Sequence, residues 1–232
     1  MSGHAGTVLI TGANRGSGRA MAEELHRAGW TVWGLNRTPS GLPWMREVVA
    51  DLRSASDVAA AVAEAARGGG LDAVVANGVQ RSLGRLDTLP LTEWEDAVAV
   101  NLTSIVVLVQ AALPHLRARK GRIVLVGSHA GTRFFEGGAA YCATKAALKA
   151  VAEVLLLEER GHGVRTSLLS PGAVASLDGD ESVYKLSTES VARTVRWVLD
   201  APEDTAVGEI ELRPARLPPE VPVTGLDRLQ AV

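Results

Sequence analysis

The chain has 232 residues, of which 47% are hydrophobic, with 24 basic side chains against 26 acidic ones and a formal net charge of −2. This length suits one large α/β domain with a full core, and the near-neutral balance excludes broad electrostatic binding to nucleic acid or to an anionic membrane. The single cysteine, Cys142, excludes an internal disulfide, and no continuous apolar run approaches the roughly 20 residues of a membrane span, so we expect a cytoplasmic protein.

A strand that begins at residue 7 runs into a glycine-rich turn and then into a helix over residues 18–29. Such a turn points several backbone N–H groups and the positive end of the helix dipole at one place, which favours a phosphate. The alternative is a plain strand-to-helix loop that needs glycine only for its φ angles. The turn supplies six candidate cofactor contacts: Gly12, Asn14, Arg15, Gly16, Ser17 and Gly18.

A second strand over residues 30–37 ends about 20 residues past the glycines, where a dinucleotide fold holds the adenosine ribose. An acidic residue at that point would accept the ribose 2′-OH of NAD, but this chain has Asn36 and Arg37 there, with Arg15 inside the glycine turn. Because guanidinium groups bind phosphate oxygens in a fork, the pattern predicts NADP(H) rather than NAD(H). The alternative is that both arginines are ordinary solvated surface residues.

The other predicted elements alternate between strand and helix. We predict a short strand that ends in residues 48–52, strands over 71–76, 122–126, 164–169 and 209–213, and helices over 56–67, 92–119, 138–160 and 188–199. In the helix over 92–119, Thr92 and Glu95 form a predicted capping box, and Pro114 is expected to kink or break the helix.

Continuous rather than alternating apolar strands are typical of a parallel sheet that is buried on both faces. Right-handed crossovers then predict an α/β fold in one domain: a Rossmann-like, doubly wound parallel sheet of about seven strands with helices on both faces and ligands at the carboxyl ends of the strands. We assign residues 1–214 to this domain and residues 215–232 to a Pro-containing tail that is either loose or laid against a neighbouring subunit.

Three side chains have the chemistry of a hydride-transfer site. Tyr141 and Lys145 are four positions apart on a predicted helix and therefore lie on one face of it. A phenol is a poor base at neutral pH, but a nearby ammonium group favours the phenolate, which suits Tyr141 to proton transfer. Ser128, at the carboxyl end of the strand over 122–126, is placed to donate a hydrogen bond to a carbonyl oxygen that gains negative charge. A nicotinamide would supply the hydride.

These motifs resemble the short-chain dehydrogenase/reductase family over roughly residues 7–214. The resemblance rests on Thr11-Gly12-x-x-x-Gly16-x-Gly18, on Tyr141-x-x-x-Lys145 and on the 13 positions that separate Ser128 from Tyr141. For the Tyr-Lys pair taken alone, a chance match on a surface helix is the alternative.

The resemblance implies a catalytic set of Asn101, Ser128, Tyr141 and Lys145. Tyr141 would act as the acid or base, and Lys145 would also hold the nicotinamide ribose. Asn101 would hold a water that joins Lys145 to solvent. A helix asparagine that bonds to nearby backbone is the alternative for Asn101.

The resemblance also implies cofactor contacts outside the glycine turn: Asp51, Leu52, Asn77, Gly78, Pro171, Gly172, Val174 and Ser176, together with Tyr141 and Lys145. Asp51 and Leu52 would lie at the adenine edge, and the segment from Pro171 would close over the nicotinamide. The chain departs from the family in Ala76-Asn77-Gly78-Val79, as if the alanine before the glycine were missing, and in the serines at 170 and 176. The first departure affects the backbone beside the adenosine ribose.

Position alone suggests three substrate contacts: Gln80, His129 and Phe135. Gln80 and its neighbour Arg81 follow the strand over 71–76, and His129 directly follows Ser128. The alternatives are a solvent-facing histidine and a phenylalanine that anchors its loop or a subunit contact. The segment over 176–187 is brief and acidic, which predicts a short lid over an open pocket or a small polar substrate.

The predicted function is an NADP(H)-dependent carbonyl reductase or alcohol dehydrogenase for a small molecule, with reduction favoured and no metal ligands. The alternatives are an imine or enone reductase on the same scaffold and a catalytically silent NADP(H)-binding sensor or interaction protein, which would not need a full Ser-Tyr-Lys set. Apolar runs in the helices over 92–119 and 138–160 predict a homodimer, or a tetramer if the last strand and the tail pair as well.

Overall fold

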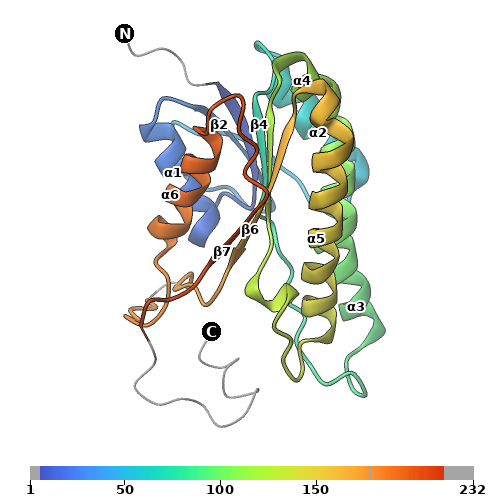
Figure 1. Ribbon diagram of the computed structural model, residues 1–232. Coiled ribbons are helices and arrows are strands. Elements are labelled where there is room, and N and C mark those ends of the chain that lie inside the picture. Colours follow the sequence, from blue (N-terminus) through green and yellow to red (C-terminus); the bar gives the residue numbers. More distant parts are fainter. Residues whose placement is uncertain (1–5, 178, 217–232) are drawn as a thin grey trace.

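Seven strands form one sheet in the order β3-β2-β1-β4-β5-β6-β7 in the computed structural model, which describes residues 6–177 and 179–216 (Figure 1). The strands are β1 (Thr7–Thr11), β2 (Thr31–Asn36), β3 (Arg46–Val49), β4 (Ala73–Ala76), β5 (Arg122–Val126), β6 (Arg165–Pro171) and β7 (Glu209–Leu212). All neighbouring strands are parallel. The strand order reverses between β1 and β4, which confirms the predicted doubly wound sheet and puts its ligand crevice at the carboxyl ends of these strands.

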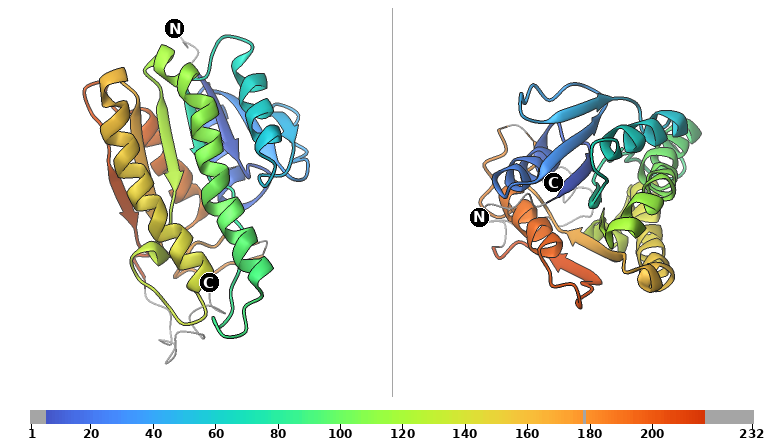
Figure 2. Two further views of the ribbon diagram at one scale, coloured as in Figure 1. Left: turned by 90° about the vertical axis from the view of Figure 1, so that its right-hand side faces the viewer. Right: turned by 90° about the horizontal axis from the view of Figure 1, so that it is seen from above.

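Helices cover both faces of the sheet (Figure 1, Figure 2). On one face α1 (Gly16–Arg27) and α6 (Thr188–Leu199) pack against each other. The other face carries α2 (Ala55–Ala66), α4 (Ser104–Arg119) and α5 (Ala139–Glu159), and α3 (Leu91–Val98) leads into α4. Three short turns complete the described elements: the π-helical η1 (Ala99–Thr103) and the 3₁₀ turns η2 (His129–Gly131) and η3 (Arg160–His162).

Each face of the sheet has its own apolar core. In β1, Leu9 belongs to the core shared with α2 and α4, whereas Val8 and Ile10 belong to the core shared with α1 and α6. All three side chains are fully buried. Successive residues of a strand point to opposite faces, so a sheet covered on both sides requires a continuous apolar run.

The helical stretch predicted over 92–119 differs from expectation in three ways. It begins at Leu91 after Pro90, without a side-chain cap, so the predicted Thr92 capping box is wrong. It does not break at Pro114, which lies inside the continuous helix α4. Pro114 and Gln110, whose carbonyl loses its N–H partner, are both exposed. The irregularity of the stretch is instead the π turn Ala99–Thr103, which carries Asn101.

The stretch Leu91–Arg119 is also long and apolar enough, by length and composition, to cross a membrane. Counting continuous apolar runs overlooks it, because polar residues interrupt it. Its inward side packs on the sheet and on α2 through Ile105, Leu108 and Ala112, as in the core helix of a globular domain.

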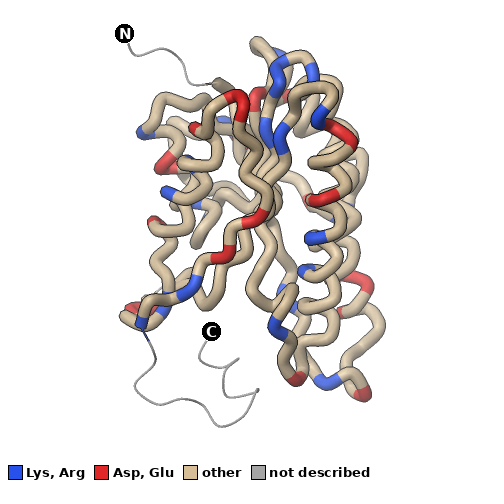
Figure 3. Tube along the Cα trace, in the orientation of Figure 1, with Lys and Arg blue, Asp and Glu red and all other residues tan. Residues whose placement is uncertain are grey.

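Lys and Arg are interspersed with Asp and Glu along the helices and strand ends in the view of Figure 3. No large area of one sign stands out in that view, in keeping with the net charge of −2. The tail predicted over 215–232 lies outside the described residues from 217 onward.

Candidate active site

Three glycines allow the chain to turn sharply from β1 into α1. Gly12 has φ +68°, and its N–H donates to Leu35 O at 2.9 Å. Gly16 has φ +51°, and a Cβ there would lie 3.0 Å from Ser176 O. A Cβ at Gly18 would lie 2.0 Å from Gly12 O, so a side chain at this position would push the turn apart. Only glycine gives a turn this tight.

The first turn of α1 is free to receive an anion. Arg15 is its N-cap residue but forms no side-chain cap, and the turn contains no acidic residue. Ser17 lies in this turn and is partly exposed. N–H groups without a side-chain cap at a helix N-terminus, behind a glycine turn, fit a dinucleotide phosphate.

The segment after β4 supports the glycine turn despite its departure from the family pattern. Thr11 Oγ1 accepts hydrogen bonds from Asn77 N at 3.0 Å and Gly78 N at 2.8 Å. Asn77 Nδ2 in turn donates to Thr11 O and Gly12 O, each at 3.2 Å. A Cβ at Gly78 would lie 2.4 Å from Leu52 Cδ1, so Leu52 packs directly on this backbone. Hydrogen bonds therefore hold the carboxyl ends of β1 and β4 together.

Asn36 does not face the ribose position as the sequence suggested. Its side chain is 1% exposed, accepts a hydrogen bond from Ala13 N at 2.6 Å and donates to Glu47 Oε1 at 3.2 Å. Glu47, on the neighbouring β3, supplies the acceptor that draws the amide inward. Asn36 thus holds the glycine turn in place rather than offering its side chain to a ligand.

Two exposed arginines flank the turn. Asn14 Nδ2 donates to Thr38 Oγ1 at 2.8 Å, which ties the glycine turn to the segment after β2. Arg15 and Arg37 lie on these two tied segments, and neither belongs to an ion pair within residues 6–177 and 179–216. Both cations remain available to an anion.

Asp51, which is predicted to lie at the adenine edge, forms an ion pair with Arg53. Arg53 NH2 lies 2.7 Å from Asp51 Oδ2, and its NH1 lies 3.1 Å from Asp96 Oδ1. The hydrogen bonds from Arg53 lower the pKa of the Asp51 carboxyl, with a smaller contribution from the charge of Arg37. The carboxylate is thus held ionised and fixed, a feature that the sequence pattern does not predict.

Tyr141, Lys145 and Ser128 come from α5 and from the turn after β5. Lys145 is 4% exposed, and its Nζ donates to Val126 O at 2.8 Å and lies 5.9 Å from the centroid of the Tyr141 ring. A Cβ at Gly131 would lie 2.8 Å from Lys145 O, so the turn that follows Ser128 packs directly on α5. Ser128 Oγ accepts a hydrogen bond from Ala130 N at 3.1 Å, which fixes its position.

Lys145 is buried without a carboxylate partner among the described residues. Burial, with a smaller contribution from the charge of Arg81, lowers the pKa of its ammonium group to about 8. A buried cation beside a phenol, in a strand-end crevice, is the arrangement expected of a proton-transfer site.

Asn101 is fully buried, and its carboxamide is fully engaged. Oδ1 accepts from Gln80 N at 2.8 Å, and Nδ2 donates to Gln80 O at 2.9 Å and to Thr144 Oγ1 at 3.2 Å. Thr144 Oγ1 donates onward to Tyr141 O at 2.9 Å. The side chain of Asn101 therefore positions the Gln80 backbone and the first turns of α5.

His129 lies at the site, but its ring faces β7. Its Nε2 is 2.8 Å from Glu211 Oε1, in an orientation that is poorly aligned for a hydrogen bond. Burial lowers the pKa of His129, while Glu211 acts in the opposite direction. Arg213 Nε also donates to Glu211 Oε1 at 2.5 Å. Within this cluster the carboxylate is occupied by neighbouring side chains.

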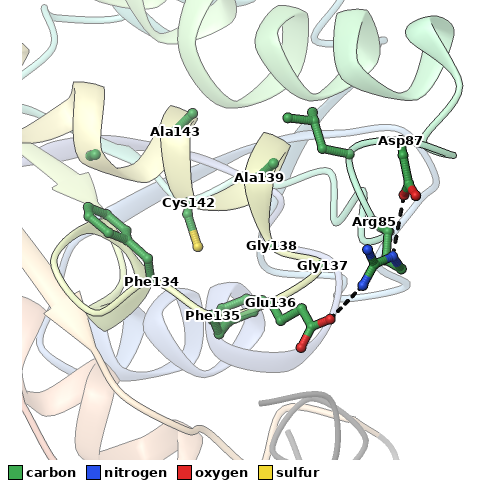
Figure 4. Close-up of a pocket in the computed structure, with 12 residues that line it drawn as sticks. Arg85, Asp87, Phe134, Phe135, Glu136, Gly137, Gly138, Ala139, Cys142 and Ala143 are labelled. Carbon is green, nitrogen blue, oxygen red and sulfur yellow. Dashed lines mark hydrogen bonds and ion pairs between the residues drawn. The ribbon is translucent and has the colours of Figure 1, made fainter.

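Phe135 does not reach this site. Its ring packs over Gly138, where a Cβ would lie 2.3 Å from Phe135 Cε2. With Phe134, Cys142 and Arg85 it lines a groove of about 910 Å³ on the outer side of α5, which includes neither Ser128 nor Tyr141 (Figure 4). The structure thus favours the alternative that Phe135 anchors its loop.

The loop after β6 returns to the glycine turn. Gly172 N donates to Leu212 O at 2.8 Å, and Val174 forms a parallel bridge with Leu186. The loop then brings Ser176 against Gly16. The segment that follows Pro171 therefore lies against the glycine turn.

An ion pair with nearly buried side chains joins residues 180 and 185 in the segment predicted to be a short lid. The sequence indicated only that this segment is acidic. Lys185 Nζ lies 2.9 Å from Asp180 Oδ2, and the two side chains are 6% and 11% exposed. Hydrogen bonds from Ser182 and Lys185 lower the pKa of Asp180 to about 2. The stabilisation that this ion pair contributes to the segment is therefore fully present above the ordinary carboxyl pKa of 3.8 and is lost as the pH falls toward 2.

We expect Lys185→Met to loosen the lid, because it leaves the Asp180 carboxylate without its cation. Chymotrypsin cleavage of the loop at pH 7 should become several-fold faster than in the unaltered protein. The control is Lys149→Met, since Lys149 pairs with Glu209 at 2.8 Å on the surface of α5. Equal cleavage rates in both variants and in the unaltered protein would show that the pair does not order the lid.

Comparison with known proteins shows the family of the chain. The family model for short chain dehydrogenases matches residues 6–186. A serine 3-dehydrogenase of Rhizobium radiobacter is 27% identical over 90% of this chain and 94% of that protein.

Two solved structures share both fold and sequence with the chain. The alcohol dehydrogenase of the archaeon Thermococcus sibiricus, complexed with 5-hydroxy-NADP, has a TM-score of 0.83 at 28% identity and covers 93% of this chain and 99% of that one. The 3-ketoacyl-ACP reductase of Sinorhizobium meliloti has a TM-score of 0.82 at 29% identity and covers 89% of this chain and 97% of that one. Because the family model matches most of this chain, the chain belongs to the short-chain dehydrogenase/reductase family of oxidoreductases.

Proposed function

We propose that the protein is an NADP(H)-dependent reductase that exchanges a hydride between the nicotinamide and a small ketone or secondary alcohol. The observation that carries this proposal is the buried Lys145 beside the Tyr141 ring, with the Ser128 turn packed on the same helix. The similar solved structures are those of an alcohol dehydrogenase and a 3-ketoacyl-ACP reductase, which supports exchange between a hydroxyl and a keto group. We further propose that the protein is cytoplasmic.

The chain's own residues have distinct parts in this reaction. A bound nicotinamide would supply the hydride. Ser128 Oγ donates a hydrogen bond to the substrate oxygen, which stabilises its growing negative charge. Tyr141 donates its hydroxyl proton to that oxygen, and the Lys145 ammonium favours the phenolate that remains. Asn101 holds Gln80 and Thr144 so that this geometry is kept.

The preference for NADP(H) over NAD(H) rests on Arg15 and Arg37. Both are exposed on segments that the hydrogen bond from Asn14 to Thr38 ties together, and we propose that both guanidinium groups bind one anion. A 2′-phosphate offers oxygens that a guanidinium fork matches. The complex of the Thermococcus sibiricus protein with 5-hydroxy-NADP supports the same choice.

Fluorescence titration with NADPH and a panel of small ketones test the proposal together. We expect NADPH to bind in the micromolar range and to be oxidised in the presence of at least one ketone. Oxidation with cyclic imines or enones alone would favour the corresponding alternative reductases. Tight NADPH binding without any turnover would favour the sensor.

We also propose that the outer faces of α4 and α5 form a homodimer. Val106, Val154 and Leu157 expose 38%, 48% and 55% of their surface on these two helices. Exposed apolar side chains on these helices favour an interface between subunits, and a two-fold axis would bury them against their own copies.

Leu157→Glu is expected to convert the dimer into a monomer, because it places charges face to face at the two-fold axis. Light scattering at micromolar concentration measures the change as a halving of the mass. The control is Trp197→Glu, since Trp197 is 60% exposed on α6, on the opposite side of the sheet, and should retain at least two subunits. A monomeric unaltered protein would contradict the proposal.

A further inference from the structure

Arg81 is a cation on the segment that follows β4. It is exposed, and no carboxylate of the described residues forms an ion pair with it. By contrast, Arg85, four residues later in the chain, forms ion pairs with Asp87 at 3.4 Å and with Glu136 at 2.7 Å. Arg81 therefore retains its full capacity to bind an anion.

The backbone on both sides of Arg81 is fixed. Gln80 exchanges two hydrogen bonds with the buried Asn101, at 2.8 and 2.9 Å. Ser82 is 2% exposed, and its Oγ donates to Glu93 Oε2 at 2.9 Å. A mobile surface loop has no such anchors on either side. The fold thus presents this guanidinium from a rigid support, which reduces the entropy lost when it binds a ligand.

The support lies beside the catalytic residues. The Asn101 carboxamide that holds Gln80 also holds Thr144, the residue before Lys145. The charge of Arg81 is close enough to Lys145 to contribute to the lowered pKa of its ammonium group. Two cations near one another repel, and an anion bound at Arg81 would offset that repulsion.

The other cations at this end of the sheet have other partners. Arg15 and Arg37 are assigned to the cofactor phosphate, and Arg133 and Arg213 lie 4.0 and 2.5 Å from Glu211 Oε1. The charges of these last two arginines are balanced in part by that carboxylate. Arg81 is accordingly the cation near Tyr141 and Lys145 that is best suited to hold a group of the substrate.

From this arrangement we infer that Arg81 binds a carboxylate of the substrate, so that the enzyme acts on small keto and hydroxy acids. The inference rests on the proposed function, because Tyr141 and Ser128 must act on the carbonyl of the same molecule. A guanidinium binds a carboxylate in a two-point fork, which would fix the orientation of the carbonyl as well as its affinity. In reduction, the carbonyl carbon gains the hydride of NADPH, the oxygen gains the proton of Tyr141, and NADP⁺ and the hydroxy acid are the products.

Acetoacetate and acetoacetamide test the inference, since they share a ketone and differ in charge. We expect the unaltered enzyme to reduce acetoacetate with a kcat/KM at least tenfold above that for acetoacetamide. Arg81→Met should lower kcat/KM for acetoacetate at least tenfold, mainly through KM, and leave acetoacetamide within about twofold. Arg81→Lys should recover part of the loss, and Arg85→Met, the paired arginine of the same loop, should change neither substrate.

Binding gives a readout that does not depend on turnover. Saturation-transfer NMR with 3-hydroxybutyrate and NADPH detects an unreactive complex, which we expect in the unaltered protein and not in Arg81→Met. Equal losses for both ketones in Arg81→Met, or 3-hydroxybutyrate binding that survives in this variant, would overturn the inference. Reduction of acetoacetate and acetoacetamide with equal kcat/KM would also overturn it, while leaving the proposed reductase intact. Absence of NADPH binding would instead overturn the proposed function.

Discussion

Tyr141→Phe is expected to lower kcat by about 10² to 10⁴-fold, the usual contribution of a general acid, while the Kd for NADPH changes by less than about threefold. The substitution removes only the hydroxyl group, which has no hydrogen-bond partner within the described residues, and leaves the ring beside Lys145. Stopped assays of ketone reduction measure kcat, and fluorescence titration measures the affinity for NADPH.

Tyr184 provides a matched control, since it is the second of the two tyrosines in the chain. Tyr184→Phe makes the same chemical change in the lid, beside Lys185, and should retain near-full activity. A Tyr141→Phe variant with more than about a tenth of the original kcat would show that another group supplies the proton.

Arg37→Asp is expected to weaken NADPH binding by about 100-fold and NADH binding by less than about threefold. The substitution replaces a partner of the 2′-phosphate with a like charge, whose cost amounts to several kcal/mol when desolvated. NADH carries no phosphate at this position, so it should be nearly indifferent. Parallel fluorescence titrations with the two cofactors measure the ratio.

Arg160→Asp controls for the change in net charge. Arg160 begins η3 at the end of α5, at the opposite edge of the sheet from the glycine turn, and should leave both affinities unchanged. If Arg37→Asp weakened NADPH and NADH equally, Arg37 would contact some other part of the ligand or of the protein.

The fold could be predicted largely from β-strand character and glycine placement. Leu9 with Val8 and Ile10 illustrates why: a strand buried on both faces shows no polar alternation, and a continuous apolar run this short is typical of few structures besides a covered parallel sheet. The turn at Gly12, Gly16 and Gly18 could also be predicted, because a Cβ at these positions would be strained or would contact neighbouring backbone too closely.

Side-chain direction could not be predicted in the same way. Asn36 stands at the end of β2 as expected, but Glu47 on β3, eleven residues later, draws its amide inward. Phe135 lies between Ser128 and Tyr141 in sequence, yet the open space over Gly138 accommodates its ring on the outer side of α5. Both outcomes depend on partners that no local pattern identifies.

The irregular turn in the helical stretch before α4 could not be predicted from the sequence either. The π turn Ala99–Thr103 contains no residue that signals it, whereas Pro114, which does signal a break, leaves the helix continuous. The turn carries Asn101, whose side chain forms hydrogen bonds with Gln80 and Thr144 next to the site. The Asp180–Lys185 pair likewise depends on a burial that only the folded lid provides.

Transfer of deuterium from [4,4-²H₂]NADPH, which is labelled on both faces of the nicotinamide ring, tests most directly that this site moves a hydride to a small carbonyl compound. Mass spectrometry of the product, with acetoacetate among a panel of small ketones, should show one deuterium on the new carbinol carbon with the unaltered enzyme and none above background with Tyr141→Phe. If NADPH binds and no ketone of the panel acquires deuterium, the protein is not the reductase proposed here.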